Sequence, residues 1–141
     1  MLGILLLSHG NMCEGVLNAM GVLGCSVDKM LALPLYMETE LEAYTQAMER
    51  AIDALDTGDG VLVIADLLSG TPFNRVCTFC ETKNIAVLTG MNLPMCITAS
   101  ELRSGAGLRE IAEECAREGR DGIVNLEALM KQLEERGSNN E

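Results

Sequence analysis

The run Gly3-Ile4-Leu5-Leu6-Leu7, which leads into Ser8-His9-Gly10, indicates how this chain folds. The run is short, apolar throughout instead of alternating, and followed by polar and glycine residues. Continuous runs of this length are typical of strands that are buried on both faces, as in a parallel sheet. The first element is therefore predicted to be a strand covered on both sides by helices.

Three further apolar runs, with helical patterns between them, extend this prediction along the chain. The runs cover residues 30–35, 60–65 and 85–89, and Pro34 places the first of these at a sheet edge because proline cannot donate to a ladder. Strands that alternate with helices predict β-α-β units and an α/β three-layer sandwich around a mainly parallel sheet. Helical spacing of apolar residues is seen in the segments 12–23, 41–55, 73–80, 108–115 and 126–133.

Composition excludes several classes of protein. With 141 residues, 48% of them hydrophobic and 22% charged, the chain is expected to form one globular domain and not a disordered one. Its net charge of −11 would repel phosphate backbones, which argues against nucleic-acid binding. The opening apolar run has no basic segment before it and is far shorter than the about 20 residues of a membrane span. We therefore expect a cytoplasmic protein with reduced cysteines.

Two polar residues follow apolar runs at matching positions. His9, the only histidine, follows the first run, and Asp66 follows the run 60–65. The carboxyl ends of neighbouring parallel strands share one rim of the sheet, where sites of α/β proteins lie. A carboxylate that accepts the N–H of one ring nitrogen leaves the other nitrogen as a nucleophile and favours the cationic, substituted ring. The sequence predicts a nucleophilic His9 that Asp66 orients and polarises.

The residues around this pair suit an anionic phosphoryl group. Thr71 is a favourable N-cap and Pro72 a favourable first helical residue, so a helix is expected to start there with free N–H groups at the rim. A second helix is expected to start beside His9. Helix N-termini and hydroxyl groups bind anionic oxygens without a fixed cation, so we expect neither a metal nor a cofactor. The candidate phosphate-binding residues are Thr71, Ser69, Gly70, Gly10 and Asn11.

Three segments together resemble the signature segments of the mannose-family enzyme IIA of the bacterial phosphoenolpyruvate-dependent sugar phosphotransferase system. They are residues 4–10 (ILLLSHG), 66–74 (DLLSGTPFN) and 90–95 (GMNLPM). Ser8 stands where the family often has Thr, and Ser69 where a second Gly is common. The resemblance covers a domain of residues 1–126. We expect residues 127–141 to form a C-terminal helix and a frayed tail from Gly137 onward, packed on the same domain.

The resemblance implies a function and an assembly. His9 would accept a phosphoryl group from the phosphocarrier protein HPr and pass it to an enzyme IIB, which serves a membrane permease of enzymes IIC and IID. Asp66 would hold His9, and Thr71 would lie beside the phosphoryl group. The family fold is a homodimer whose last strand is antiparallel and exchanged between subunits, and residues 121–125 match that strand. A mannose-type enzyme IIB carries its own phosphorylated histidine, so the acceptor would be a separate chain. The protein would work in the cytoplasm, peripherally associated with the permease.

Three alternatives remain open. One is the related phosphotransferase subunit of a dihydroxyacetone kinase, although residues 70–74 argue against it. Another is a regulatory module whose phosphorylation state signals to a partner. The third is a thiol redox protein that uses Cys77 and Cys80. Redox dithiols sit at helix N-termini, whereas Cys77 falls about two turns into an expected helix, so we expect these cysteines to pack in the core. The sugar is open among mannose, fructose, sorbose and amino sugars.

Overall fold

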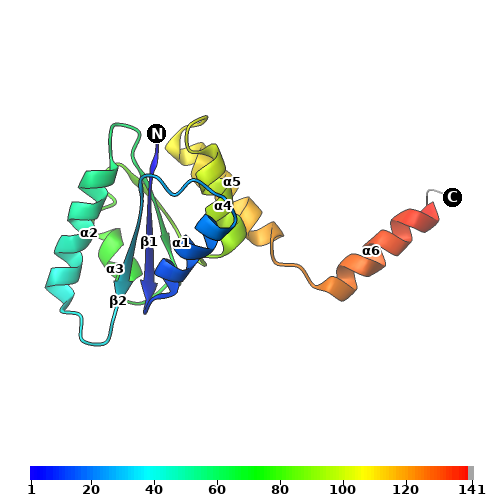
Figure 1. Ribbon diagram of the computed structural model, residues 1–141, viewed down its shortest axis with the longest axis horizontal. Coiled ribbons are helices and arrows are strands. Elements are labelled where there is room, and N and C mark those ends of the chain that lie inside the picture. Colours follow the sequence, from blue (N-terminus) through cyan, green and yellow to red (C-terminus); the bar gives the residue numbers. More distant parts are fainter. Residues whose placement is uncertain (140–141) are drawn as a thin grey trace.

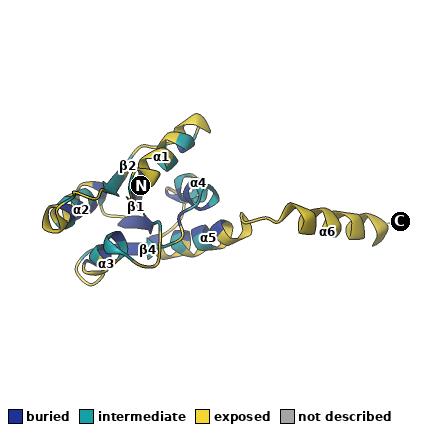
Figure 2. Ribbon diagram, turned by 90° about the horizontal axis from the view of Figure 1, so that it is seen from below, coloured by how far each residue is buried: buried dark blue, intermediate teal, exposed yellow. Residues whose placement is uncertain are grey.

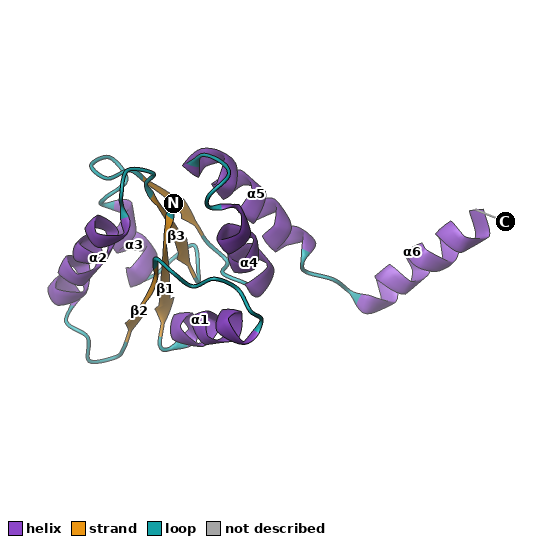
Figure 3. Ribbon diagram, turned by 45° about the horizontal axis from the view of Figure 1, so that its top comes forward, coloured by secondary structure: helices purple, strands orange, loops and turns teal. Residues whose placement is uncertain are grey.

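The computed structural model describes residues 1–139 and shows an α/β fold in which helices cover both faces of a parallel sheet (Figures 1 and 3). The sheet has four strands in the order β2-β1-β3-β4, and every neighbouring pair is parallel. The predicted α/β fold class with a parallel sheet is confirmed, and so is the edge position of the strand that contains Pro34. The strands are β1 (Gly3–His9), β2 (Met30–Leu35), β3 (Val61–Ala65) and β4 (Ile85–Leu88).

The continuous apolar character of β1 follows from its burial on both faces. Ile4 and Leu6 pack with α1 (Met12–Val22), α4 (Leu93–Leu102) and α5 (Leu108–Asp121). Leu5 and Leu7 point the other way and pack with α2 (Leu41–Leu55) and the residues of α3 (Thr71–Cys77). All four side chains are fully buried. Because successive strand residues alternate between faces, an inner strand needs apolar residues at every position.

Helix α4 lies in a segment for which no helix was predicted. It starts after Asn92, whose side-chain oxygen accepts a hydrogen bond from the N–H of Met95 at 3.0 Å, and Pro94 occupies its first turn. Both features are helix-start signals. The apolar pattern nevertheless predicts no helix here, because the apolar residues of α4 form no clear one-sided stripe.

Helix α3 corrects the prediction for Cys77 and Cys80. The helix ends at Cys77 instead of continuing to residue 80, and turns follow it. Val76 and Phe79 are buried, whereas both cysteines are exposed. The expectation that these cysteines pack in the core is therefore wrong, because it assumed that helical periodicity continued through residue 80.

The C-terminal segment also differs from the prediction. Helix α6 (Leu126–Asn139) projects away from the rest of the chain and buries none of its residues (Figures 1 and 2). The expectation that it packs on the same domain is wrong, because the extended residues 123–125 carry it away from the sheet. Residues 137–139, expected to fray, are helical, and residues 140–141 of that tail lie outside the described residues.

The expected last strand is absent from this chain taken alone. Helix α5 continues to Asp121, and residues 123–125 belong to no strand within residues 1–139. Strand exchange in a homodimer stays a prediction. Within the same described range, no helix is both long and apolar enough to cross a bilayer.

Candidate active site

His9 and Asp66 lie together at the carboxyl end of the sheet. Their strands β1 and β3 are neighbours, with Leu7 opposite Ala65 at the end of the register. The carboxylate oxygen Oδ2 of Asp66 accepts a hydrogen bond from the backbone N–H of His9 at 2.9 Å and lies 2.8 Å from Nδ1 of the ring. The predicted juxtaposition of this histidine and this carboxylate is therefore confirmed.

The contacts of Asp66 orient the imidazole. Its Oδ2 is occupied by His9, while its Oδ1 accepts the N–H of Leu67 at 2.9 Å. Because a carboxylate only accepts hydrogen bonds, Nδ1 carries the proton in this contact, and Nε2 of the neutral ring keeps its lone pair. The His9 side chain is 46% exposed and that of Asp66 only 10%. The ring is thus held from the protein side and open on the other.

The charge of Asp66 is maintained by the same contacts. Burial raises the pKa of this carboxyl, but hydrogen bonds from the backbone N–H and ring of His9, the charge of His9 and the N–H of Leu67 lower it more. The net pKa of Asp66 lies below its usual value. Asp66 is therefore an anion at neutral pH, as the stabilisation of a cationic imidazole requires.

Gly70 lies directly against the exposed edge of the imidazole. A Cβ atom at this position would stand 2.7 Å from Cε1 and 2.8 Å from Nε2 of His9. The φ angle of Gly70 is +91°, in the left-handed region that favours glycine. Any side chain here would occupy the space next to Nε2, so the absence of one is a requirement of the site.

The start of α3, next to Gly70, has backbone N–H groups without hydrogen-bond partners in the described part of the chain. Thr71 is the first helical residue and Gly70 occupies the N-cap position, so the prediction of Thr71 as N-cap is wrong by one residue. The N–H groups of Gly70, Thr71 and Phe73 donate no hydrogen bond within residues 1–139. Ser69 is exposed on the bend that precedes them. The loop that carries Gly70 past the ring thus ends in these unpaired N–H groups at the start of α3.

The turn after His9 is fastened by a residue that sequence reasoning did not assign to the site. Ser8 is fully buried, its hydroxyl donates to the carbonyl of Gly10 at 2.9 Å, and it accepts the N–H of Cys13 at 2.9 Å. The N–H of Gly10 donates to Leu35 at 2.7 Å, and Asn11 precedes α1 without a side-chain cap bond. A lone hydroxyl inside an otherwise apolar strand was the signal that could have identified Ser8.

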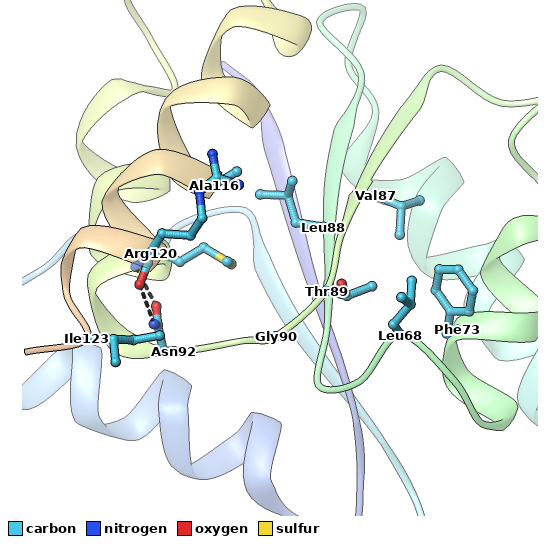
Figure 4. A pocket seen from close by; sticks show the side chains of 12 residues that line it. Leu68, Phe73, Val87, Leu88, Thr89, Gly90, Asn92, Ala116, Arg120 and Ile123 are labelled. Carbon is cyan, nitrogen blue, oxygen red and sulfur yellow. Dashed lines mark hydrogen bonds between the residues drawn. The ribbon is translucent and has the colours of Figure 1, made fainter.

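Two hollows border the site. One of about 300 Å³ is lined by His9 itself together with Gly10, Leu35, Tyr36 and Met37. A second, of about 420 Å³, lies beyond the loop that carries Leu68, between Phe73 and the end of α5, and does not include His9 (Figure 4). A molecule that contacts His9 would therefore occupy the first hollow and not the second.

Fold and geometry together define a class, an α/β protein with a carboxylate-held histidine at the carboxyl rim of a parallel sheet. The family model described as "PTS system fructose IIA component" matches residues 3–116. The chain belongs to this family, the mannose-type enzyme IIA components of the sugar phosphotransferase system. Members are phosphotransferases that in general work with HPr and an enzyme IIB.

Individual relatives agree with this assignment. The chain is 20% identical over 133 residues to the PTS system fructose-specific EIIA component of Bacillus subtilis (strain 168), covering 94% of this chain and 84% of that protein. The structure of a phosphotransferase system component EIIA from Streptococcus agalactiae is similar, with a TM-score of 0.83, 25% identity and coverage of 91% and 99% of the two chains. A mannose/sorbose-specific IIA subunit from Enterococcus faecalis has a TM-score of 0.75 and 29% identity over 88% of this chain and 93% of its own.

Proposed function

We propose that His9 carries the phosphoryl group in this enzyme IIA component, accepting it from phospho-HPr and delivering it to a separate enzyme IIB. The observation that carries the proposal is the contact of His9 Nδ1 with Asp66 at 2.8 Å, which leaves Nε2 as the unbonded nitrogen of a side chain that is 46% exposed. In this proposal Nε2 attacks phosphorus, the bond between phosphorus and the donor's nitrogen breaks, and Nδ1 keeps its proton. The ring becomes cationic, and the adjacent carboxylate stabilises that charge.

The phosphoryl oxygens are held by the loop before α3. Gly70 lies against Cε1 and Nε2 of His9, and we assign the phosphoryl oxygens to the N–H groups of Gly70 and Thr71, which begin α3, and to the hydroxyls of Thr71 and Ser69. Gly10, which lines the same hollow as His9, and Asn11 complete the proposed phosphate-binding residues. Hydrogen-bond donors of this kind compensate phosphate charge without a cation, so no metal takes part.

The acceptor in this proposal is an enzyme IIB with a phosphorylated histidine of its own, which takes the group from Nε2 of His9. His9 is the only histidine of these 141 residues, so the accepting histidine does not lie among them. The sugar then enters through a membrane permease of enzymes IIC and IID, and the protein works from the cytoplasmic side of that complex.

We propose further that the protein is a homodimer with an exchanged last strand. Within residues 1–139, β4 pairs only with β3, so its other edge is free. Ile123, which lines the hollow of Figure 4, and Val124 after it are both exposed and belong to no helix or strand. In a two-fold dimer, the apolar segment of each subunit can pair with the unpaired strand edge of the other subunit.

The proposal is tested by reconstituting the transfer. The protein is incubated with phosphoenolpyruvate, enzyme I and HPr, and its intact mass is followed before and after enzyme IIB is added. We expect gain of one phosphoryl group, absence of that gain in His9→Ala, and loss of the group to enzyme IIB. If the His9→Ala variant were still phosphorylated, the assignment of His9 as the phosphorylated residue would be refuted. A group that enzyme IIB does not remove would favour the regulatory alternative.

A further inference from the structure

Cys77 and Cys80 form the one sequence motif that phosphoryl transfer does not use. They lie at and just after the end of α3, and both side chains are exposed. The neighbours Val76 and Phe79 fill the core instead, with 0% and 7% exposure. The two thiols therefore share the outer side of this turn, where a small reagent reaches them.

The backbone brings the two cysteines within bonding range. The N–H of Cys80 donates to the carbonyl of Cys77 at 3.2 Å, which closes a turn of four residues. Such a turn places its first and last Cα atoms less than about 7 Å apart, and a disulfide spans about 4.4–6.8 Å. Closing a disulfide here requires side-chain rotation with little movement of the backbone.

The interactions of the two sulfur atoms also indicate that Cys77 and Cys80 lie close together. Partial burial raises the pKa of the Cys77 thiol, and its charge interaction and hydrogen bond with Cys80 raise it further. The Cys80 thiol also lies 3.9 Å from the carbonyl oxygen of Val76, to which it donates. The two thiols are thus close enough across the turn for Cys80 to affect the ionisation of Cys77.

We propose that Cys77 and Cys80 are a reversible dithiol–disulfide site whose substrate is a small two-electron oxidant of the hydroperoxide class. One sulfur attacks the peroxide, the O–O bond breaks, and a sulfenic acid and one molecule of water (or alcohol) form. The second thiol then attacks the sulfenic sulfur, the S–S bond forms, and a molecule of water leaves. The two cysteines lose two hydrogens and two electrons, and the peroxide is reduced. A thiol reductant reverses the change.

The other cysteines do not compete for this role. Cys13, Cys96 and Cys115 are buried, and burial raises the pKa of both Cys96 and Cys115 to about 12. Side chains buried in this way are out of reach of a reagent and so react slowly, whereas Cys77 and Cys80 are exposed. Cys25 is half-buried and stands alone at the end of α1. The site goes beyond phosphoryl transfer and does not depend on it.

The test oxidises the full chain with hydrogen peroxide and follows its thiols. After removal of the oxidant, the protein is denatured without reductant, alkylated and weighed. Of the six cysteines, we expect four to be alkylated, with the mass lowered by two hydrogens and both changes reversed by a thiol reductant. Peptide mapping should place the bond between Cys77 and Cys80.

Cysteine variants show whether the disulfide links Cys77 to Cys80 or involves other cysteines. Cys77→Ser and Cys80→Ser should each abolish it, whereas Cys25→Ser should retain it. His9→Ala should oxidise like the native chain, so failure of the phosphoryl-transfer proposal would not affect this one. Six alkylated cysteines in the oxidised native protein would overturn the proposal. A bond that persists in Cys80→Ser, or one that links two chains, would also overturn it.

Discussion

The site depends on how one carboxylate oxygen is used. Oδ2 of Asp66 faces both the backbone N–H and Nδ1 of His9, so it positions the main chain and selects the ring tautomer at once. Neither contact involves Nε2. Changes to Asp66 should therefore affect the chemistry of the ring more than the folding of the chain.

Replacing Asp66 by Asn tests this division. The amide keeps the shape of the side chain but removes the charge. Because both carboxylate oxygens accept backbone N–H groups, one of these N–H groups loses its acceptor whichever way the amide is turned, and an NH2 group that faces Nδ1 moves the ring proton to Nε2. We expect Asp66→Asn to slow phosphorylation by HPr by on the order of a hundredfold or more. Quench-flow mass spectrometry gives the rate, and circular dichroism checks the fold. Unchanged kinetics would remove Asp66 from the mechanism.

Gly70 offers a test of the space next to Nε2. Gly70→Ala combines an unfavourable positive φ with a Cβ placed 2.7–2.8 Å from the ring. The backbone effect should lower the free energy of unfolding by about 1–2 kcal/mol, and the ring contact should also suppress phosphorylation.

A matched glycine separates these two effects. Gly24 has a φ of +83° and nothing within 4 Å of an added Cβ. Gly24→Ala should show a similar loss of stability in urea unfolding with phosphorylation intact. If Gly70→Ala also kept its phosphorylation rate, the contact with Nε2 would have no functional meaning.

Among the elements, those with two-sided burial were the most predictable. Residues 4–7 of β1 and 61–65 of β3 are all apolar, and the alignment of these strands in a parallel sheet brings His9 to Asp66. Periodicity was less informative where the chain leaves its helix, as at Cys77, because a pattern of spacings does not mark the point where helical hydrogen bonding stops. Periodicity also does not show what an apolar helix face packs against. The prediction that α6 packs on the same domain was wrong for this reason.

Helix α4, which the apolar pattern did not reveal, depends on the N-cap residue that precedes it. Asn92 caps α4 through Met95 and donates from its Nδ2 to the carbonyl of Gly119 at 2.8 Å, which links α4 to α5. Asn92→Ala should reduce the free energy of unfolding by about 1–3 kcal/mol. Asn11 holds the same cap position on α1 without a side-chain bond, so Asn11→Ala should cost less. Urea unfolding measures both, and equal losses would contradict this role for Asn92.

At the level of the whole molecule, the C-terminal region leaves apolar surface without a covering. Leu126, Leu129, Met130 and Leu133 recur at helical spacing on α6 and are all exposed, as are Ile123 and Val124 before it. Isolated helices of this length are marginal in water, so α6 gains from packing on another molecule. The proposed homodimer provides such a surface next to the free edge of β4.

Light scattering after size exclusion tests the assembly. The native chain should have the mass of two copies at micromolar concentration. The double variant Ile123→Asp with Val124→Asp should shift to the mass of one copy, because it places charge in the proposed exchanged segment. Val22→Asp, at a position that is 82% exposed on α1, serves as the control and should remain dimeric. A native chain of single mass would refute the dimer.

The position of the phosphoryl group on the imidazole tests the central claim most directly. Because His9 is the only histidine, one long-range proton–nitrogen correlation spectrum of the phosphorylated, nitrogen-15-labelled protein reports on this ring alone. The geometry predicts phosphorus on Nε2, with Nδ1 still protonated towards Asp66. Phosphorus on Nδ1, or a histidine spectrum that phosphorylation leaves unchanged, would contradict it.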